Sequence, residues 1–312
     1  MEPAPCIGVV VHPTKVVEDS LLTLQEWAGR TGVRLLVRDD EAARLPPSVT
    51  VEAVPDEAFL EQVHALVSLG GDGTMLGAMR LALDRPVPVL GVNYGNVGFL
   101  VEVTPAELGS VLDRLPSGEF VVEPHSCVEL EAGGGTAAAF NDVVLGAAEP
   151  GGSVELELEV EATPFGYYRC DALVVSTPTG STAYNYAAGG PVISPGADVL
   201  AMTPVAPMTG LSHSVVLPAA DIVRLRNVAT GRDAVIRLDG NAWGDLSPSE
   251  AVSARLRPDA GLVVRIDPAR HARRSRLKLS LLDLPLRREQ IADLLPTEVR
   301  DEVLRLRERF GP

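Results

Sequence analysis

The order of apolar runs along the chain is the feature that most constrains its fold. Up to about residue 120, short β-branched runs such as Ile7–Val11 and Val87–Val92 alternate with amphipathic stretches such as 16–31. This alternation predicts strand–helix–strand units and a parallel sheet. Beyond that point, strand-like runs follow one another with glycine-rich breaks, and Ser153–Val160 alternates polar and apolar residues, as a strand with one solvated face does.

The sequence therefore predicts two domains. Residues 1–120 form an α/β domain with a Rossmann-like parallel sheet, and residues 121–274 form a mostly antiparallel β-sandwich. The segment 275–312 has a helix-forming composition and is expected to join the N-terminal domain. A length of 312 residues accommodates one large or two modest domains, and 46% hydrophobic residues can bury a sizeable core. A cleft between domains is a usual place for a ligand.

The charge balance argues against nucleic acid as a partner. The formal net charge is −15, and the only local basic cluster is residues 270–278; a protein that neutralises a phosphate backbone normally carries a basic face. The three cysteines, Cys6, Cys127 and Cys170, are scattered and fit a reducing compartment. Neither a signal-type leader nor an apolar run of about 18 residues occurs. We therefore expect a cytoplasmic protein without a membrane segment.

Lysine is almost absent from the chain. Lys15 and Lys278 are the only two lysines, and neither lies in a glycine-rich segment. If the chain binds phosphate groups, their charge is expected to be met by backbone N–H groups, arginine or a divalent metal.

The first segment with chemical content is Gly70–Thr74, Gly-Gly-Asp-Gly-Thr. It follows the apolar run Ala65–Leu69 and precedes a helical pattern over 75–83. Glycines let a ligand approach the main chain, and the start of a helix offers free N–H groups and a positive dipole end to an anion. Asp72 would repel that anion, so it is expected to act as a proton acceptor, a metal ligand or a partner of a sugar hydroxyl. A helix N-cap or an Asp-Gly turn is the structural alternative.

Two further segments place polar residues at predicted strands. Residues 91–100, Gly-Val-Asn-Tyr-Gly-Asn-Val-Gly-Phe-Leu, form a turn-rich stretch after an apolar run, at the sheet edge where ligand contacts gather in open parallel sheets. Asn141 and Asp142 interrupt the apolar run Phe-Asn-Asp-Val-Val-Leu. They indicate either a bulge or a pair of side chains that faces a ligand.

The fourth segment, 171–195, is rich in hydroxyl groups. A predicted strand ends in Ser-Thr-Pro-Thr-Gly-Ser-Thr at 176–182, which leads into the one helix we expect between residues 120 and 266, Ser181–Ala188. Five hydroxyls within these seven residues could hydrogen-bond a polar ligand without adding charge. Tyr184 could stack on a base.

Together the four segments resemble the NAD kinase family, and the match covers most of the chain. It includes Gly-Gly-Asp-Gly-Thr at 70–74, Asn-x-Gly-x-x-Gly-Phe-Leu at 93–100 and the Asn-acidic pair at 141–142. It also includes TPTGSTAY at 177–184 with GGPVISP at 189–195. The first motif occurs in lipid kinases and phosphofructokinases as well, whereas TPTGSTAY with Gly-Gly-Pro is much more specific to NAD kinases.

The resemblance implies an NAD kinase-like fold and the transfer of a phosphoryl group from ATP or polyphosphate to the 2′-hydroxyl of the adenosine ribose of NAD, which gives NADP. It implies that Asp72 accepts the proton of that hydroxyl and that Mg²⁺ or another divalent metal accompanies ATP, with no metal ligand assigned. It also implies a homodimer or homotetramer in which two subunits meet at the site. The residues that it places at the substrates are Gly71, Gly73, Thr74, Asn141, Asp142, Arg169, Asp171, Thr179, Thr182, Ala183, Tyr184, Asn185, Ala187 and Asn241.

The chain departs from the family pattern at several positions. Residues 170–172 are Cys-Asp-Ala where Gly-Asp-Gly is usual, Met208 stands in place of a histidine, His213 in place of an arginine, and Asp142 in place of the commoner glutamate. These changes concern substrate preference and rate more than fold. Two other interpretations therefore stay open: a related lipid or small-molecule kinase, and a low-activity NAD-binding paralogue that acts as a nucleotide sensor.

Overall fold

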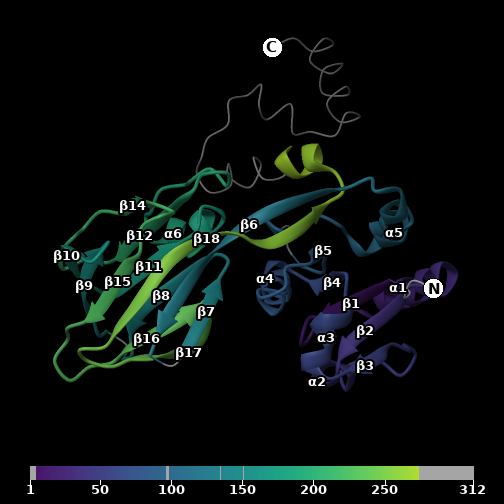
Figure 1. The fold of residues 1–312 in the computed structure, drawn as a ribbon, viewed down its shortest axis with the longest axis horizontal. Coiled ribbons are helices and arrows are strands. Elements are labelled where there is room, and N and C mark those ends of the chain that lie inside the picture. The colour runs from purple at the N-terminus through teal and green to yellow at the C-terminus, as the bar shows by residue number, and fades with distance from the viewer. Residues whose placement is uncertain (1–4, 96–97, 134, 150, 274–312) are drawn as a thin grey trace, which may run out of the picture.

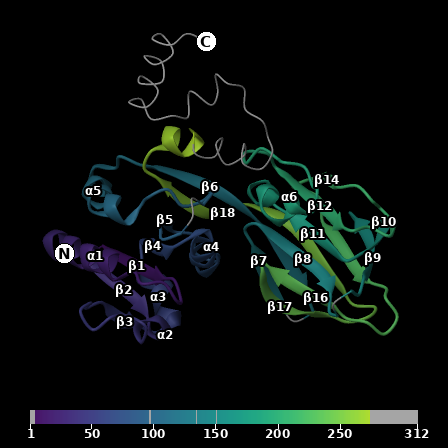
Figure 2. The ribbon, with the colours of Figure 1, turned by 180° about the vertical axis from the view of Figure 1, so that it is seen from behind.

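A parallel sheet flanked by helices forms the N-terminal half of the molecule (Figures 1 and 2). The computed structural model describes residues 5–95, 98–133, 135–149 and 151–273. The parallel strands, in the order β3-β2-β1-β4-β5, are β1 (Cys6–Val11), β2 (Arg34–Arg38), β3 (Glu52–Val54), β4 (Ala65–Gly70) and β5 (Pro88–Asn93). The helices are α1 (Glu18–Thr31), α2 (Asp39–Ala42), α3 (Asp56–Gln62), α4 (Asp72–Leu81) and α5 (Leu108–Arg114), with 3₁₀ turns η1 (Pro105–Glu107) and η2 (Leu115–Ser117). The α/β prediction is confirmed.

Two antiparallel layers form the other half, called the sandwich below. One layer has the order β14-β12-β11-β8-β16-β17, and the other contains β13-β10-β9-β15-β18 with β6 and β7 paired alongside. Both layers contribute to one hydrophobic core, in which Leu145 and Val175 come from one layer and Leu156 and Leu225 from the other. The predicted sandwich is therefore confirmed. The strands are β6 (Val121–Ala132), β7 (Gly135–Ala139), β8 (Asp142–Ala147), β9 (Val154–Val160), β10 (Thr163–Cys170), β11 (Ala172–Ser176), β12 (Val199–Val205), β13 (Thr209–Gly210), β14 (Val215–Pro218), β15 (Val223–Asn227), β16 (Ala234–Leu238), β17 (Asn241–Leu246) and β18 (Ala251–Arg265).

The two long strands β6 and β18 join the halves, and Figure 1 shows them running from the sandwich to the parallel sheet. They pair with each other antiparallel from Ser253 to Arg265, with an irregularity between Arg257 and Gly261. Near its end β18 also pairs in parallel with β5, at Leu262 and Val263. A single twelve-stranded sheet therefore crosses from one half to the other. The segment 275–312, expected to join the N-terminal domain, lies outside the described residues.

Two helices begin or end differently from the sequence prediction. The helix expected over 75–83 begins earlier, at Asp72, because β4 ends at Gly70 and the extended Gly71 is the N-cap residue directly before the helix. The helix expected over 181–188 is divided into η3 (Thr179–Thr182) and α6 (Tyr184–Ala187), because Ala183 has a non-helical backbone with φ −93° and ψ −126°. No helix in the described part of the chain is long and apolar enough to cross a membrane.

Candidate active site

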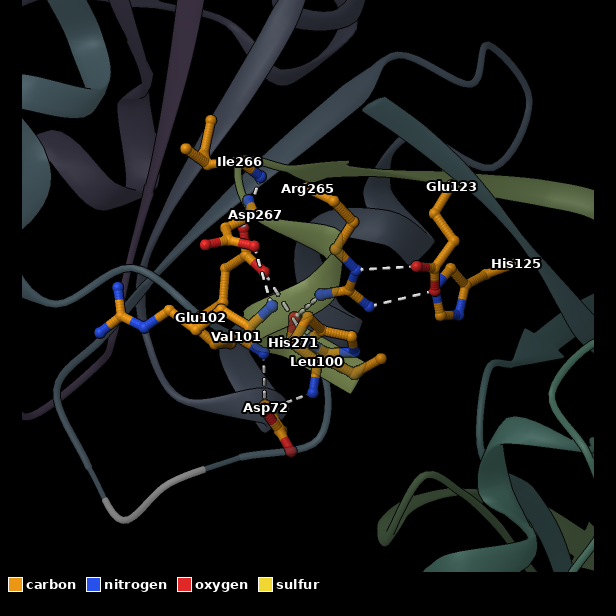
Figure 3. Close-up of polar contacts among 11 residues, drawn as sticks. Asp72, Leu100, Val101, Glu102, Glu123, His125, Arg265, Ile266, Asp267 and His271 are labelled. Carbon is orange, nitrogen blue, oxygen red and sulfur yellow. Dashed lines mark hydrogen bonds and ion pairs between the residues drawn. The ribbon is translucent and has the colours of Figure 1, made fainter. Parts of the chain in front are cut away.

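Asp72 lies in the first turn of α4, directly after β4 (Figure 3). Its Oδ2 accepts a hydrogen bond from the backbone N–H of Phe99 (2.6 Å), and its Oδ1 accepts from the N–H groups of Leu100 (3.1 Å) and Val101 (3.2 Å). An ionised carboxylate offers about four acceptor positions. The segment after β5 therefore fixes the carboxylate, and the donors among the described residues leave Oδ2 one position for a further donor.

Two glycines are required by the side chains around this carboxylate. A Cβ at Gly98 would lie 1.8 Å from Oδ1 of Asp72, and a Cβ at Gly70 would lie 2.0 Å from Oγ1 of Thr74. No side chain fits at either distance. The two glycine-rich motifs, distant in the sequence, therefore form one structural unit around Asp72.

A pocket of about 920 Å³, called the α4 pocket here, is lined by Gly71, Gly73 and Thr74 at the start of α4. Arg38 and Arg44 also line it, and both pair with the buried Glu41, at 3.4 Å and 3.3 Å. Burial raises the pKa of Glu41, and the two arginines oppose this shift. Exposed N–H groups at a helix start and nearby cations attract anions. The other charged lining residues are Lys15, Asp40, Arg80 and Asp239.

Lys15 differs from the other cations of the α4 pocket. Its Nζ donates a hydrogen bond to the carbonyl of Tyr94 at 3.1 Å. None of the ion pairs found within the described residues involves Lys15. Arg38, Arg44 and Arg80, by contrast, each pair with a carboxylate. The sequence places Lys15 outside any glycine-rich segment, but the fold brings it to the same pocket as Gly71 and Gly73. It is the cation most available to an incoming anion.

A second pocket, of about 670 Å³, lies in the sandwich and is called the sandwich pocket here. Its lining residues are Asn141, Asp142, Val144, Gly146, Ala147, Glu149, Gly151, Gly152, Asp171, Ala172, Ala183, Tyr184, Val205, Arg237, Asp239 and Gly240. Four of these residues are acidic and one, Arg237, is basic. This lining favours a ligand that donates hydrogen bonds over one that brings phosphate charge.

Asp142 is a buried acid of the sandwich pocket, with 4% of its surface exposed. Burial raises its pKa to about 7, the charge of Asp239 adds to the shift, and the backbone N–H of Tyr184 opposes it. Near neutral pH the carboxyl is therefore close to half protonated, and it can either donate or accept a hydrogen bond.

Asp239 connects the two pockets, because it lines both. Its carboxylate accepts hydrogen bonds from the backbone N–H groups of Phe140 (3.1 Å), Asn141 (2.7 Å) and Asp142 (3.2 Å). It also pairs with Arg80 of α4 at 2.5 Å, and its side chain is almost fully buried. One side chain therefore fixes the turn that carries Asn141 and links it to the helix that begins at Asp72.

Most hydroxyls of the stretch 176–182 support the loop itself. Ser176, Thr177 and Ser181 are fully buried. The Thr177 hydroxyl donates to the carbonyl of Phe140 (2.7 Å) and accepts from the N–H of Gly180 (2.9 Å). The expectation that these hydroxyls together meet a ligand is wrong for these three, because the chain is folded too tightly here: a Cβ at Gly180 would lie 2.0 Å from the carbonyl oxygen of Asn141.

Family models match both halves of the chain. A model of the ATP-NAD kinase N-terminal domain matches residues 7–120, and a model of the ATP-NAD kinase C-terminal domain matches residues 140–264. The chain belongs to the NAD kinase family. The NAD kinase of Bordetella pertussis is 32% identical over 246 residues, which cover 76% of this chain and 82% of that protein. The NAD kinase of Gemmatimonas aurantiaca is 35% identical over 223 residues, which cover 70% and 77%. The chain is therefore a phosphotransferase.

Solved structures of NAD kinase relatives have the same fold. Yeast NADH kinase complexed with NADH superposes with a TM-score of 0.78 at 21% identity, over 92% of this chain and 90% of that one. An NAD kinase from Archaeoglobus fulgidus in complex with ATP superposes with a TM-score of 0.68 at 22% identity, over 89% and 98%.

The structure separates the residues that the NAD kinase resemblance places at the substrates into three groups. Asn141, Asp142, Asp171, Ala183 and Tyr184 line the sandwich pocket, and Gly71, Gly73, Thr74 and Asn241 line the α4 pocket. Arg169, Thr179, Thr182, Asn185 and Ala187 line neither.

Members of the third group have partners elsewhere in the fold. Asn185 is fully buried, and its amide donates to the carbonyls of Ser181 (3.1 Å) and Pro191 (2.9 Å) and accepts from the Thr203 hydroxyl (2.7 Å). Arg169 pairs with Glu155 at 3.6 Å. The side chain of Asn185 therefore stabilises the loop by joining Ser181, Pro191 and Thr203.

Met208 and His213, which depart from the NAD kinase pattern, lie on the connection between β12 and β14. Both are exposed, and neither lines the two pockets.

The charged lining residues that the sequence prediction did not assign to the site include Lys15, Arg80, Arg237 and Asp239. Only two of these four carried a signal. Lys15 is one of two lysines, and Asp239 precedes a glycine. Arg80 and Arg237 are two arginines among many.

Proposed function

We propose that this protein is an NAD kinase that transfers the terminal phosphoryl group of ATP or polyphosphate to the 2′-hydroxyl of the adenosine ribose of NAD. The observation that carries the proposal is the meeting of two pockets of opposite character at Asp239. One pocket is acidic and the other contains cations and the start of α4. The acidic pocket suits the hydrogen-bond donors of the phosphoryl acceptor, and the pocket with cations suits the negative charge of the phosphoryl donor.

The sandwich pocket suits the adenosine part of NAD. An adenine amino group and ribose hydroxyls are hydrogen-bond donors, and the side chains of Asn141, Asp142 and Asp171 offer acceptors to them. Tyr184, exposed on the pocket wall, can border the base.

The α4 pocket suits the phosphates of the donor. Lys15 offers an ammonium group, and Gly71 to Thr74 offer backbone N–H groups at the positive end of the α4 dipole. Among the described residues, no group of three or more His, Cys, Asp or Glu side chains is placed to hold a metal ion. This fits Mg²⁺, which usually binds through substrate phosphates, water and one or two carboxylates. We propose that Mg²⁺ arrives with the donor and offsets its charge.

Asp72 is proposed as the proton acceptor. The 2′-hydroxyl would donate to the remaining acceptor position on Oδ2 of Asp72. As the hydroxyl oxygen forms its bond to the terminal phosphorus, the bond from that phosphorus to the leaving oxygen breaks and the proton moves to the carboxylate. The other product is ADP or a shortened polyphosphate.

The test is to incubate the purified protein with NAD and Mg²⁺, with ATP or with polyphosphate, and to measure NADP with a coupled dehydrogenase. NADP formation is expected, and its absence with both donors would exclude the proposal. Calorimetry with NAD then separates the alternatives: binding without turnover indicates a nucleotide sensor, and no binding indicates a lipid or small-molecule kinase.

Asp72→Asn tests the proton acceptor. The variant is expected to bind NAD with normal affinity and to lose at least about a hundredfold in kcat, because general-base catalysis contributes about 10²–10⁴-fold. Near-normal turnover in this variant would show that Asp72 is not the base.

We also propose a homodimer or homotetramer in the cytoplasm. Phe165 and Tyr167, two residues apart on β10 and both half exposed, support an assembly surface. Three free cysteines support a reducing compartment. Light scattering coupled to gel filtration measures the mass of the assembly, and a monomer at working concentration would contradict this proposal.

A further inference from the structure

A buried arginine lies behind the segment that binds Asp72. Arg265, at the end of β18, is 1% exposed. It is the largest fully buried side chain among the described residues. Its Nε donates to Oε2 of Glu123 on β6 (3.0 Å), and its Nη2 donates to Oε1 (3.2 Å). Desolvation of a guanidinium is costly. Such a group is retained in a core only where its partners compensate or where it has a role.

The third nitrogen of Arg265 contacts the segment that binds Asp72. Its Nη1 donates to the carbonyl oxygen of Leu100. That carbonyl belongs to the same peptide unit as the N–H of Val101, which donates to Oδ1 of Asp72. Figure 3 shows Leu100 and Val101 between Arg265 and Asp72. Arg265 therefore binds one end of a peptide group whose other end binds the carboxylate, and hydrogen bonds in such a chain strengthen one another.

The ion pair between Arg265 and Glu123 has a third partner, His125. Glu123 accepts from Arg265 and also contacts the buried His125 at 2.8 Å. Burial raises the pKa of Glu123, but His125 and Arg265 outweigh burial and hold the pKa well below its ordinary value. The carboxylate therefore stays charged opposite the guanidinium over the whole working range of pH.

The same segment is bound to β18 a second time. Oε1 of Glu102 accepts hydrogen bonds from the backbone N–H groups of Ile266 (2.5 Å) and Asp267 (3.3 Å). Residues 100 and 102 are thus both tied to the end of β18, and the N–H of Val101 cannot turn away from Asp72 without breaking the bond from Arg265 to the Leu100 carbonyl.

We propose that Arg265, held by Glu123, is a positioning residue that aims the backbone N–H groups of 99–101 at Asp72 and so sets the orientation of its free acceptor position. This inference rests on the proposed role of Asp72 as proton acceptor. The alternative is a buried ion pair that stabilises the fold without any bearing on turnover.

The first experiment compares Arg265→Met with Arg255→Met. Arg255 pairs with Glu129 at 2.6 Å on the same two strands, β18 and β6, but it does not contact the Asp72 segment. We expect Arg265→Met to lower kcat at least about tenfold with an unchanged KM for NAD, and Arg265→Lys to restore part of it. Arg255→Met is expected to change neither constant by more than about twofold. Equal losses in the two Met variants would overturn the proposal.

A double-mutant cycle shows whether Arg265 acts through Asp72. In the Asp72→Asn background, Arg265→Met is expected to cause no further loss of kcat, because the group that it positions is gone. The same loss in both backgrounds would assign Arg265 a structural role only. If Arg265→Met does not fold, Glu123→Gln replaces it in the same cycle, since it removes the charge that holds the guanidinium.

Hydrogen exchange supplies a measurement that does not need turnover. The amides of 99–101 are expected to exchange faster in Arg265→Met than in the wild-type protein, while those of Arg255→Met stay at the wild-type rate. Unchanged exchange at 99–101 would overturn the proposal. If the protein forms no NADP, or if Asp72→Asn keeps its turnover, the proposed function fails, and the exchange rates still decide whether Arg265 positions this segment.

Discussion

Replacing Asp142 by asparagine is expected to stabilise the free protein at alkaline pH. In the folded state the pKa of Asp142 rises from 3.8 to about 7 because the carboxyl is buried and lies near the charge of Asp239. Each pKa unit corresponds to about 1.4 kcal/mol, so ionised Asp142 costs the folded state up to about 4 kcal/mol. Asparagine has the same shape, keeps an acceptor for the N–H of Tyr184 and removes this cost.

The sign of the pH dependence follows from the raised pKa. Below about pH 4 Asp142 is protonated in the folded and the unfolded state, and the wild-type protein and the variant should differ little. Between about pH 4 and pH 7 only the unfolded state releases the proton, so the wild-type protein loses stability relative to the variant as the pH rises. Above about pH 7 the difference should stay constant.

Urea unfolding at several pH values from 4 to 8.5 measures this difference. The matched control is Asp171→Asn, which removes the same charge from the same pocket at an exposed position and should leave the free energy of unfolding within about 0.5 kcal/mol of wild type. If Asp142→Asn is less stable than wild type at pH 8.5, the carboxylate is not an uncompensated buried charge, and the reasoning is refuted. The variant should also bind NAD more weakly, because an amide cannot accept at both of its polar atoms.

Three further outcomes are expected. Lys15→Met should raise the KM for the phosphoryl donor about tenfold or more without changing NAD affinity, since Lys15 lines only the α4 pocket; steady-state kinetics with each substrate varied would show it. Gly98→Ala should abolish most turnover, because its Cβ would overlap the Asp72 carboxylate; intact folding by circular dichroism with normal kcat would contradict this. Arg80→Met should lower the free energy of unfolding by about 3 kcal/mol, because the buried Asp239 loses its counter-charge; a denaturation midpoint at the wild-type value would disprove it.

Local sequence pattern was sufficient for the two architectures and for the motifs, but not for the bounds of every helix. The alternation before residue 120 predicted the parallel sheet, and the strand-rich texture after it predicted the sandwich, because side-chain periodicity reflects which face is buried. Glycine-rich turns at strand ends identified Asp72, Asn141 and Asp142. Pattern could not separate the side chains that line a pocket from those that support the loop: Thr177 and Asn185 belong to the same segment, 171–195, as Tyr184, but they are buried and hydrogen-bonded to other parts of the fold.

The sequence by itself determined the family and the two architectures, and it identified Asp72 as the candidate acid. Only the tertiary structure decided what surrounds that acid, because its partners are far away along the chain. Asp72 is bound by 99–101, and the carbonyl of Leu100 is bound by Arg265, 165 positions later. Lys15 lines the α4 pocket from the segment that follows β1. A buried polar group must find its hydrogen-bond partners wherever the fold brings them, and no local pattern records that choice.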